Sequence, residues 1–240
     1  MLCLDDSYAK ECIATVIAVT GKCTELDVNL FYPQGGGQPY DTGTITCGTA
    51  QFRVVSVKKN EGKIVHELDR EPHLSELKVG DQVKCTLDWE RRYAFMRIHT
   101  AAHVLAATMH TQMGVFISGG QLDLEKSRFD FTLTEVDKEK MECIVQRANE
   151  ILHKDITLNI YALPREEALK IPGVVKLATA LPPSIPTLRI VEIPGVDLQA
   201  DGGTHVRNLQ EVGQLELLKL ENKGAENKRM YFRLKKEDAN

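Results

Sequence analysis

The chain has 240 residues, of which 42% are hydrophobic and 27% charged, and its formal net charge is −4 at pH 7. This composition is ordinary for a soluble globular protein and leaves room for one large domain or two small ones. No apolar run approaches the roughly 20 residues of a membrane span, and the N-terminus lacks the order of a signal peptide. We therefore expect a cytoplasmic protein with no membrane partner, and the net charge gives no overall attraction to nucleic acid.

The first 88 residues predict a small β-barrel. Short runs that contain β-branched residues alternate with turn clusters, and no helical period of convincing length occurs there. The expected strands are residues 14–19, 44–46, 52–57, 64–68 and 82–87. We assign residues 1–88 to a β-barrel domain with a glycine-rich motif.

The sequence pattern changes near Asp88, where a helical period replaces the strand pattern. An amphipathic helix is expected from about Trp89 to Met113, with Gly114 as its stop. Its apolar positions are Phe95, Ile98, Ala102, Leu105 and Met109.

The remaining chain mixes strands with one further helix. Residues 127–133 alternate as a strand does, and residues 137–153 have helical spacing with Thr134 or Asp137 as the cap. Further strands are expected at residues 157–162, 188–193, 212–220 and 229–234. Residues 89–240 are therefore predicted to form an α+β domain with two main helices against an antiparallel sheet, and the whole chain is assigned to the α+β class.

Three histidines form the most informative pattern. His99 and His103 are four residues apart on the predicted helix, which places both imidazoles on one face. His205 follows two glycines about a hundred residues later, and Asp201 lies four residues before it. This set suits a tetrahedral metal held by His99, His103 and His205, with Asp201 as a fourth ligand, as the holder of a bound water, or as a simple turn former.

The histidine pair has two other interpretations. The zinc peptidase motif requires Glu directly after the first His, and here that residue is Thr100, which cannot deprotonate a bound water. A pair at this spacing also occurs by chance on ordinary helices. The six cysteines include no Cys-x-x-Cys pair and lie far from the histidines in sequence, so they predict neither a zinc ribbon nor a disulfide framework.

A second motif runs from Phe31 to Gln38 and contains Gly35, Gly36 and Gly37. Three consecutive glycines permit positive φ and close approach of the backbone to another surface. The motif lacks the Lys and Ser/Thr of a phosphate-binding loop. It is either a tight barrel turn or a loop that lines the metal pocket.

Basic residues cluster in two places. Arg91 and Arg92 open the histidine helix, and Arg128 lies in an alternating strand. Each could contact an RNA phosphate, and Arg128 could equally be a structural ion-pair partner. A further basic group near the C-terminus is either a phosphate-binding face or a set of solvated charges on an edge hairpin. Its members are Lys219, Lys223, Lys228, Arg229, Arg233, Lys235 and Lys236.

Together these motifs resemble the editing domain of alanyl-tRNA synthetase and its freestanding AlaX-type relatives. The histidine pair with Gly202-Gly203-Thr204-His205 carries the resemblance, and it spans essentially the whole chain. The glycine-rich motif is similar to that of the medium-length AlaX group, which has an N-terminal barrel. Two intervening segments, residues 119–123 and 127–131, also resemble the family.

The resemblance implies hydrolysis of mischarged alanine tRNA at a zinc site, above all Ser-tRNA(Ala), with Gly-tRNA(Ala) as a further candidate. A pocket built for alanine cannot strongly reject serine or glycine, so a second hydrolytic site is needed. The expected partner is tRNA and not DNA. Ser118 and Gln121 are the nearest candidates for serine recognition, Gln121 and Asp201 are the candidate catalytic residues, and Thr204 is expected to line the pocket.

One position departs from the family pattern. Many relatives have a Cys-x-x-x-His motif, and Asp201 stands at the cysteine position here. Two alternatives therefore stay open: an RNA-binding relative that has lost hydrolysis, and a metal-dependent deacylase for another aminoacyl-tRNA.

Overall fold

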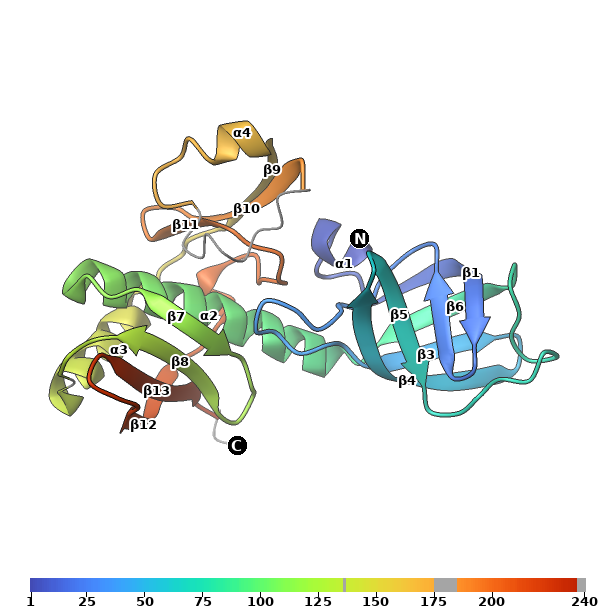
Figure 1. The fold of residues 1–240 in the computed structure, drawn as a ribbon, viewed down its shortest axis with the longest axis horizontal. Helices are drawn as coiled ribbons and strands as arrows, with labels where there is room; N and C mark the ends of the chain where they lie inside the picture. Colours follow the sequence, from blue (N-terminus) through green and yellow to red (C-terminus); the bar gives the residue numbers. More distant parts are fainter. Residues whose placement is uncertain (136, 175–184, 237–240) are drawn as a thin grey trace. The chain divides into compact units, whose positions relative to one another are not determined.

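The structure is a computed structural model that describes residues 1–135, 137–174 and 185–236. It divides into two compact units, Met1–Phe95 (unit 1) and Met96–Asn240 (unit 2). Figure 1 shows the elements of both units along the chain. Within the described ranges, no helix is both long and apolar enough to cross a membrane.

Unit 1 is a closed six-stranded barrel with the strand order β1-β2-β5-β4-β3-β6, as the sequence predicts. All neighbouring strands whose register is defined pair antiparallel. The strands are β1 (Glu11–Thr20), β2 (Cys23–Leu26), β3 (Gly43–Cys47), β4 (Ala50–Asn60), β5 (Lys63–Leu68) and β6 (Gln82–Leu87), and a short helix α1 (Leu2–Asp5) precedes them.

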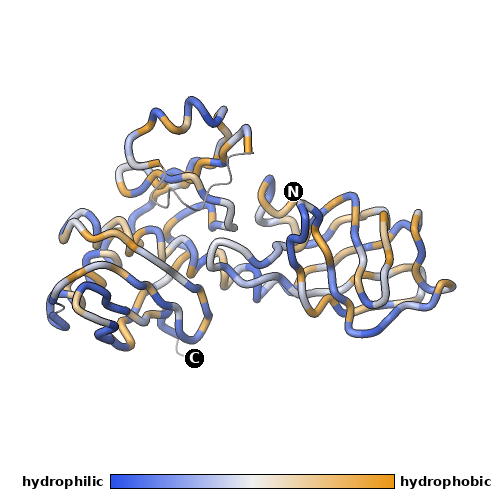
Figure 2. Tube along the Cα trace, viewed as in Figure 1, coloured by the Kyte–Doolittle hydropathy of each residue, from blue (hydrophilic) through white to orange (hydrophobic). Residues whose placement is uncertain are grey.

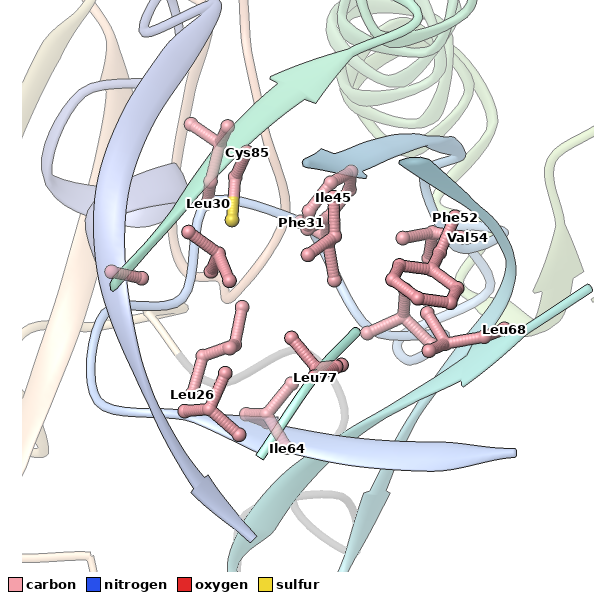
Figure 3. Packing of buried hydrophobic residues seen from close by; sticks show 14 of the residues in the cluster. Leu26, Leu30, Phe31, Ile45, Phe52, Val54, Ile64, Leu68, Leu77 and Cys85 are labelled. Carbon is pink, nitrogen blue, oxygen red and sulfur yellow. The ribbon is translucent and has the colours of Figure 1, made fainter. Parts of the chain in front are cut away.

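Every second side chain along the strands points into the barrel and fills it. In β5, the buried positions are Ile64, His66 and Leu68, and the residues between them face outward. Hydrophobic and hydrophilic residues accordingly alternate along the strands of unit 1 (Figure 2). Figure 3 shows Phe31, Phe52 and the aliphatic side chains meeting inside the barrel. The interior is therefore a packed core.

Helix α2 (Trp89–Met113) matches the expected bounds, but the expected amphipathic character is wrong. Between Phe95 and Met109, only Arg97 and Ala106 escape full burial. A helix that is buried on all sides is typical of the interior of a fold and not of its surface. The two ligand candidates on α2 therefore lie in a buried segment.

Unit 2 contains two antiparallel sheets in place of the single sheet expected. One has the order β11-β10-β9 and the other β12-β13-β8-β7. Helix α3 begins after Asp137, whose side chain accepts a hydrogen bond from the Glu139 amide as an N-cap, and it packs on β12. The elements are β7 (Ile117–Gln121), β8 (Ser127–Thr132), α3 (Lys138–Leu152), β9 (Asn159–Pro164), α4 (Arg165–Ala168), β10 (Thr187–Ile193), β11 (Asp197–Ala200), η1 (Leu209–Glu211), β12 (Leu215–Asn222) and β13 (Asn227–Leu234). The α+β class is confirmed.

Candidate metal centre

Three imidazole rings meet inside unit 2. His99 and His103 lie one helical turn apart on α2, and their ring centroids are 5.0 Å apart. The ring of His205 lies 4.4 Å from that of His99 and 4.7 Å from that of His103. All three residues are buried. The folded chain thus brings together the three histidines that the sequence singles out.

Asp201 joins the three histidines. Its Oδ2 lies 3.0 Å from Nε2 of His205, and its Oδ1 lies 3.7 Å from Nε2 of His99 and 3.9 Å from Nε2 of His103. One ligand atom from each of the four residues lies within 4.8 Å of the others. In a tetrahedral zinc site with bonds of about 2.0 Å, ligand atoms are about 3.3 Å apart. The separations around Asp201 fit such a site.

The backbone around Asp201 holds its carboxylate in place. The amide of Gly203 donates to Oδ2 at 2.6 Å, closing a tight turn. Nη1 of Arg189 donates to the carbonyl oxygens of Asp201 and Gly203 at 3.2 and 3.0 Å. The loop that delivers Asp201 and His205 is therefore anchored to β10.

The environment favours the protonation states that a metal needs. Burial lowers the pKa of His205 to about 4 and holds the pKa of His99 well below its usual 6.5. Burial acts to raise the pKa of Asp201, but the proximity of His99 and the hydrogen bond with His205 outweigh it, so that this pKa lies well below 3.8. Near pH 7, His99 and His205 are therefore neutral and Asp201 is ionised, which are the forms that bind a cation.

A carboxylate that the sequence analysis missed stands behind His103. Oδ2 of Asp197 lies 3.0 Å from Nδ1 of His103, and the side chain of Asp197 is fully buried. Asp197, Gln199 and Asp201 alternate along β11 and the residue after it, so they share one face of the strand. The spacing Asp-x-Gln-x-Asp would place these three side chains on one face of a strand. Because β11 is only four residues long, its sequence instead predicts part of a loop.

Thr100 stands behind His205. Its Oγ1 lies 3.1 Å from Nδ1 of His205 and accepts a hydrogen bond from the amide of Val206 at 3.3 Å. In the sequence, Thr100 excludes a zinc peptidase motif, because it stands where that motif requires Glu. In the structure its buried hydroxyl ties α2 to the segment that carries His205.

The other predicted site residues of unit 2 lie in different settings. Thr204 is fully buried beside His205. Ser118 and Gln121 are exposed on β7, the edge strand of the four-stranded sheet, and neither belongs to the four-residue cluster. Arg128 is half-buried on β8, opposite Gln121. The roles expected of these four residues remain predictions.

The glycine-rich motif forms a closed turn in unit 1. Gly35 and Gln38 exchange two backbone hydrogen bonds of 3.1 and 2.9 Å, while Gly36 and Gly37 have φ values of 58° and 83°. Positive φ at both central residues is typical of a tight two-residue turn and explains the glycines. Gly35 and Gly36 are exposed. A role for the three glycines in lining the pocket stays a prediction.

The structure corrects the role predicted for Arg92. Its side chain is fully buried in unit 1, where it pairs with Asp41 and donates to the carbonyl oxygens of Ser7 and Leu30. A guanidinium with this burial has no surface to offer a phosphate, so Arg92 is a structural residue. The neighbouring Arg91 is half-buried and donates to the Tyr40 carbonyl oxygen, and its contact with tRNA remains a prediction.

Most basic side chains of the β12–β13 hairpin are engaged within the protein. Arg229 pairs with Asp130, and Lys219 and Lys223 pair with Glu221. Lys228 is buried and donates to Asn222 and two carbonyl oxygens. Such pairing favours a structural role for the hairpin charges over a dedicated phosphate-binding face.

The comparisons with known proteins agree with this geometry. Residues 5–91 match the family described as tRNA synthetases class II (A), and residues 188–231 match the threonyl and alanyl tRNA synthetase second additional domain. The alanyl-tRNA editing protein AlaX-M of Saccharolobus solfataricus is 46% identical over 236 residues, which cover 98% of each chain. The protein of the same name from Methanosarcina barkeri is 44% identical and covers 95% of this chain and 96% of its own. The alanine–tRNA ligase of Hyperthermus butylicus is 36% identical over 90% of this chain but only 23% of its own length.

Proposed function

Because the chain belongs to the AlaX-M family of alanyl-tRNA editing proteins, we propose that it hydrolyses the ester bond of alanine tRNA that carries the wrong amino acid. The proposed substrates are Ser-tRNA(Ala) and, second, Gly-tRNA(Ala). Both are products that an alanine-sized synthetic pocket cannot strongly reject. Aminoacyl-tRNA is made in the cytoplasm, which is where we propose that the protein acts.

The observation that carries the proposal is the convergence of His99, His103, His205 and Asp201 in unit 2. Three imidazoles and one carboxylate form a donor set that zinc prefers. When bound, zinc would supply Lewis acidity toward the ester carbonyl or an activated water. Asp201 is the fourth member of this donor set, and its carboxylate offers either a metal ligand or a proton acceptor.

The bond changes are those of ester hydrolysis. Water adds to the carbonyl carbon, the bond from that carbon to the ribose oxygen breaks, and the ribose oxygen takes up a proton. The products are a free amino acid and a tRNA with a free terminal hydroxyl. In this scheme Thr204 lines the pocket beside His205, and Gln121 and Ser118 are the candidates for contact with the serine hydroxyl.

The test is release of serine from Ser-tRNA(Ala), with Ala-tRNA(Ala) alongside, before and after removal of metal by a chelator. We expect rapid release of serine, little release of alanine, and recovery of the chelated protein on addition of zinc. His103→Ala should bind no zinc and release no serine. His110→Ala is the matched control, because His110 lies on the same helix but is exposed and outside the cluster.

Two results would contradict the proposal. Retention of Ser-tRNA(Ala) without release of serine would favour an RNA-binding relative without hydrolysis, and Asp201→Cys would then test whether a thiolate restores turnover. Faster hydrolysis of another aminoacyl-tRNA than of Ser-tRNA(Ala) would instead identify a deacylase of different specificity.

A further inference from the structure

We propose that Asp197 is a positioning residue that fixes the tautomer of His103, so that Nε2 of this ring is free to bind metal. The proposal rests on the metal site proposed above and extends it to residues behind the ligands. A ligating histidine commonly donates its second ring N–H to a carboxylate, which orients the ring and raises its basicity.

The contacts of Asp197 determine which nitrogen of His103 carries the hydrogen. Oδ2 of Asp197 lies 3.0 Å from Nδ1 of His103 and 2.7 Å from Nε2 of Gln199. An ionised carboxylate only accepts hydrogen bonds, so both nitrogens must donate to it. The amide nitrogen of Gln199 also lies 2.6 Å from Nδ1 of His103, so Gln199 and Asp197 both lie against this ring nitrogen.

A reversed Gln199 amide would point its oxygen at the carboxylate, and two acceptors would then face each other. With the carboxylate of Asp197 as the acceptor, Nδ1 of His103 is the protonated nitrogen of the ring. Nε2 of the same ring faces the cluster and lies 3.9 Å from Asp201, beyond hydrogen-bond distance. That nitrogen is left with a lone pair directed at the proposed metal position.

Thr100 provides the contrast that singles out Asp197. A threonine hydroxyl can donate or accept, so the contact with Nδ1 of His205 is compatible with either tautomer of that ring. A carboxylate has no such freedom. Asp197 therefore specifies the metal-ready form of its histidine even before a metal arrives, whereas Thr100 permits a change on binding.

The first measurement is the tautomer of His103 in metal-free protein, read by nitrogen NMR of histidine-labelled samples. We expect the Nδ1-protonated form in the wild-type protein and its loss in Asp197→Ala. Asp197→Asn should retain it, since the amide oxygen still accepts from Nδ1–H. An Nε2-protonated His103 in the metal-free wild-type protein would overturn the proposal.

The second measurement is zinc affinity, by competition between the metal-free protein and a chromophoric chelator. Asp197→Ala should bind zinc about 10–100-fold more weakly, and Asp197→Asn should recover part of the loss. Asp130→Asn is the matched control, because that carboxylate of unit 2 pairs with Arg229 and no histidine, and its zinc affinity should match the wild type.

These outcomes distinguish a failure of the role proposed for Asp197 from a failure of the proposed function. A wild-type protein without zinc affinity would refute the metal site itself. Wild-type affinity in both Asp197 variants would refute only the role of Asp197, with the editing site intact. If Asp197→Ala fails to fold, Asp197→Asn is compared with the wild type alone. The expected result is an unchanged tautomer of His103 together with a modest loss of zinc affinity. An unchanged zinc affinity in Asp197→Asn contradicts the role of Asp197.

Discussion

The hydroxyl of Thr100 lies 3.1 Å from Nδ1 of His205, although 105 positions separate the two residues in the chain. The same oxygen accepts a hydrogen bond from the amide of Val206. One short side chain on α2 thus holds both the ring and the backbone of the segment that delivers the third histidine. The position that carries the general base in a zinc peptidase motif here serves the geometry of the ligands.

Replacing Thr100 tests this contact. Thr100→Val keeps the shape of the side chain but leaves the buried Val206 amide without its acceptor, which costs about 1–3 kcal/mol of unfolding free energy. Thr100→Ser retains the hydroxyl and should lose less. Urea denaturation of the metal-free proteins measures both, and equal stability of Thr100→Val and wild type would contradict the contact.

Breaking the buried ion pair between Arg92 and Asp41 should destabilise unit 1 more than breaking an exposed pair. Arg92→Met leaves a buried carboxylate without its partner and should lower the unfolding free energy by about 3–5 kcal/mol. Arg53→Met removes a partly exposed pair with Asp88 and should cost less than about 1 kcal/mol. Fluorescence of Trp89, the only tryptophan, reports on this unit. Equal losses in the two variants would show that burial of the pair contributes nothing.

His66 should make unit 1 sensitive to acid. Burial lowers its pKa to about 4 from an ordinary 6.5, so the unfolded chain takes up a proton at a higher pH than the folded one. Its contribution to stability is complete above pH 6.5 and is lost as the pH falls toward 4. Between pH 7 and pH 5 the loss from this group is about 2 kcal/mol.

The control for this pH effect is His66→Leu, which cannot titrate. The difference in unfolding free energy between pH 7 and pH 5 should be smaller in His66→Leu than in the wild type by the amount above, with Trp89 fluorescence as the probe. Parallel pH dependences in the two proteins would mean that the pKa of His66 is the same in the folded and the unfolded chain.

Substitution at Gly36 separates a pocket role from a turn role. Gly36 has a φ of 58° with open space around its Cα, so Gly36→Leu adds bulk and a strain of about 1–2 kcal/mol. Gly48 has a φ of 55° and equally open surroundings elsewhere in the barrel, so Gly48→Leu carries the same strain. If the loop lines the pocket, kcat/KM for Ser-tRNA(Ala) falls at least tenfold in Gly36→Leu alone. Equal kinetics in both variants would reduce the motif to a barrel turn.

The sequence predicted the barrel and the two main helices because their patterns are local. Strands such as β6 alternate clearly, and α3 shows both a helical period and an acidic cap. The sequence does not predict strands β2, β7 and β11, since β2 and β11 have four residues each and β7 contains two glycines in place of apolar alternation. Burial of α2 on every side was also missed, because packing around a helix depends on the whole chain.

Prediction of the site residues likewise succeeded where the pattern is local and failed where it depends on tertiary packing. The three histidines and Asp201 carry recognisable chemistry and spacing, so sequence reasoning could group them. Asp197 could not be grouped, because only the pairing of β11 with β10 brings its carboxylate behind His103. The exclusion of Arg92 as a phosphate contact likewise required the tertiary structure, since a buried and an exposed arginine look alike in a sequence.

The origin of the four ligand atoms on two distant segments has a consequence for folding. An ion held by α2 and by the loop before η1 would join the two ends of a chain segment of about one hundred residues, and bringing those ends together costs the unfolded chain conformational entropy. The unfolded chain cannot present these atoms together, so the ion would bind only the native form of unit 2. At a free ion concentration a thousand times the Kd, this linkage stabilises the native state by about 4 kcal/mol. Metal supply in the cell would then govern how long the protein survives as well as how fast it works.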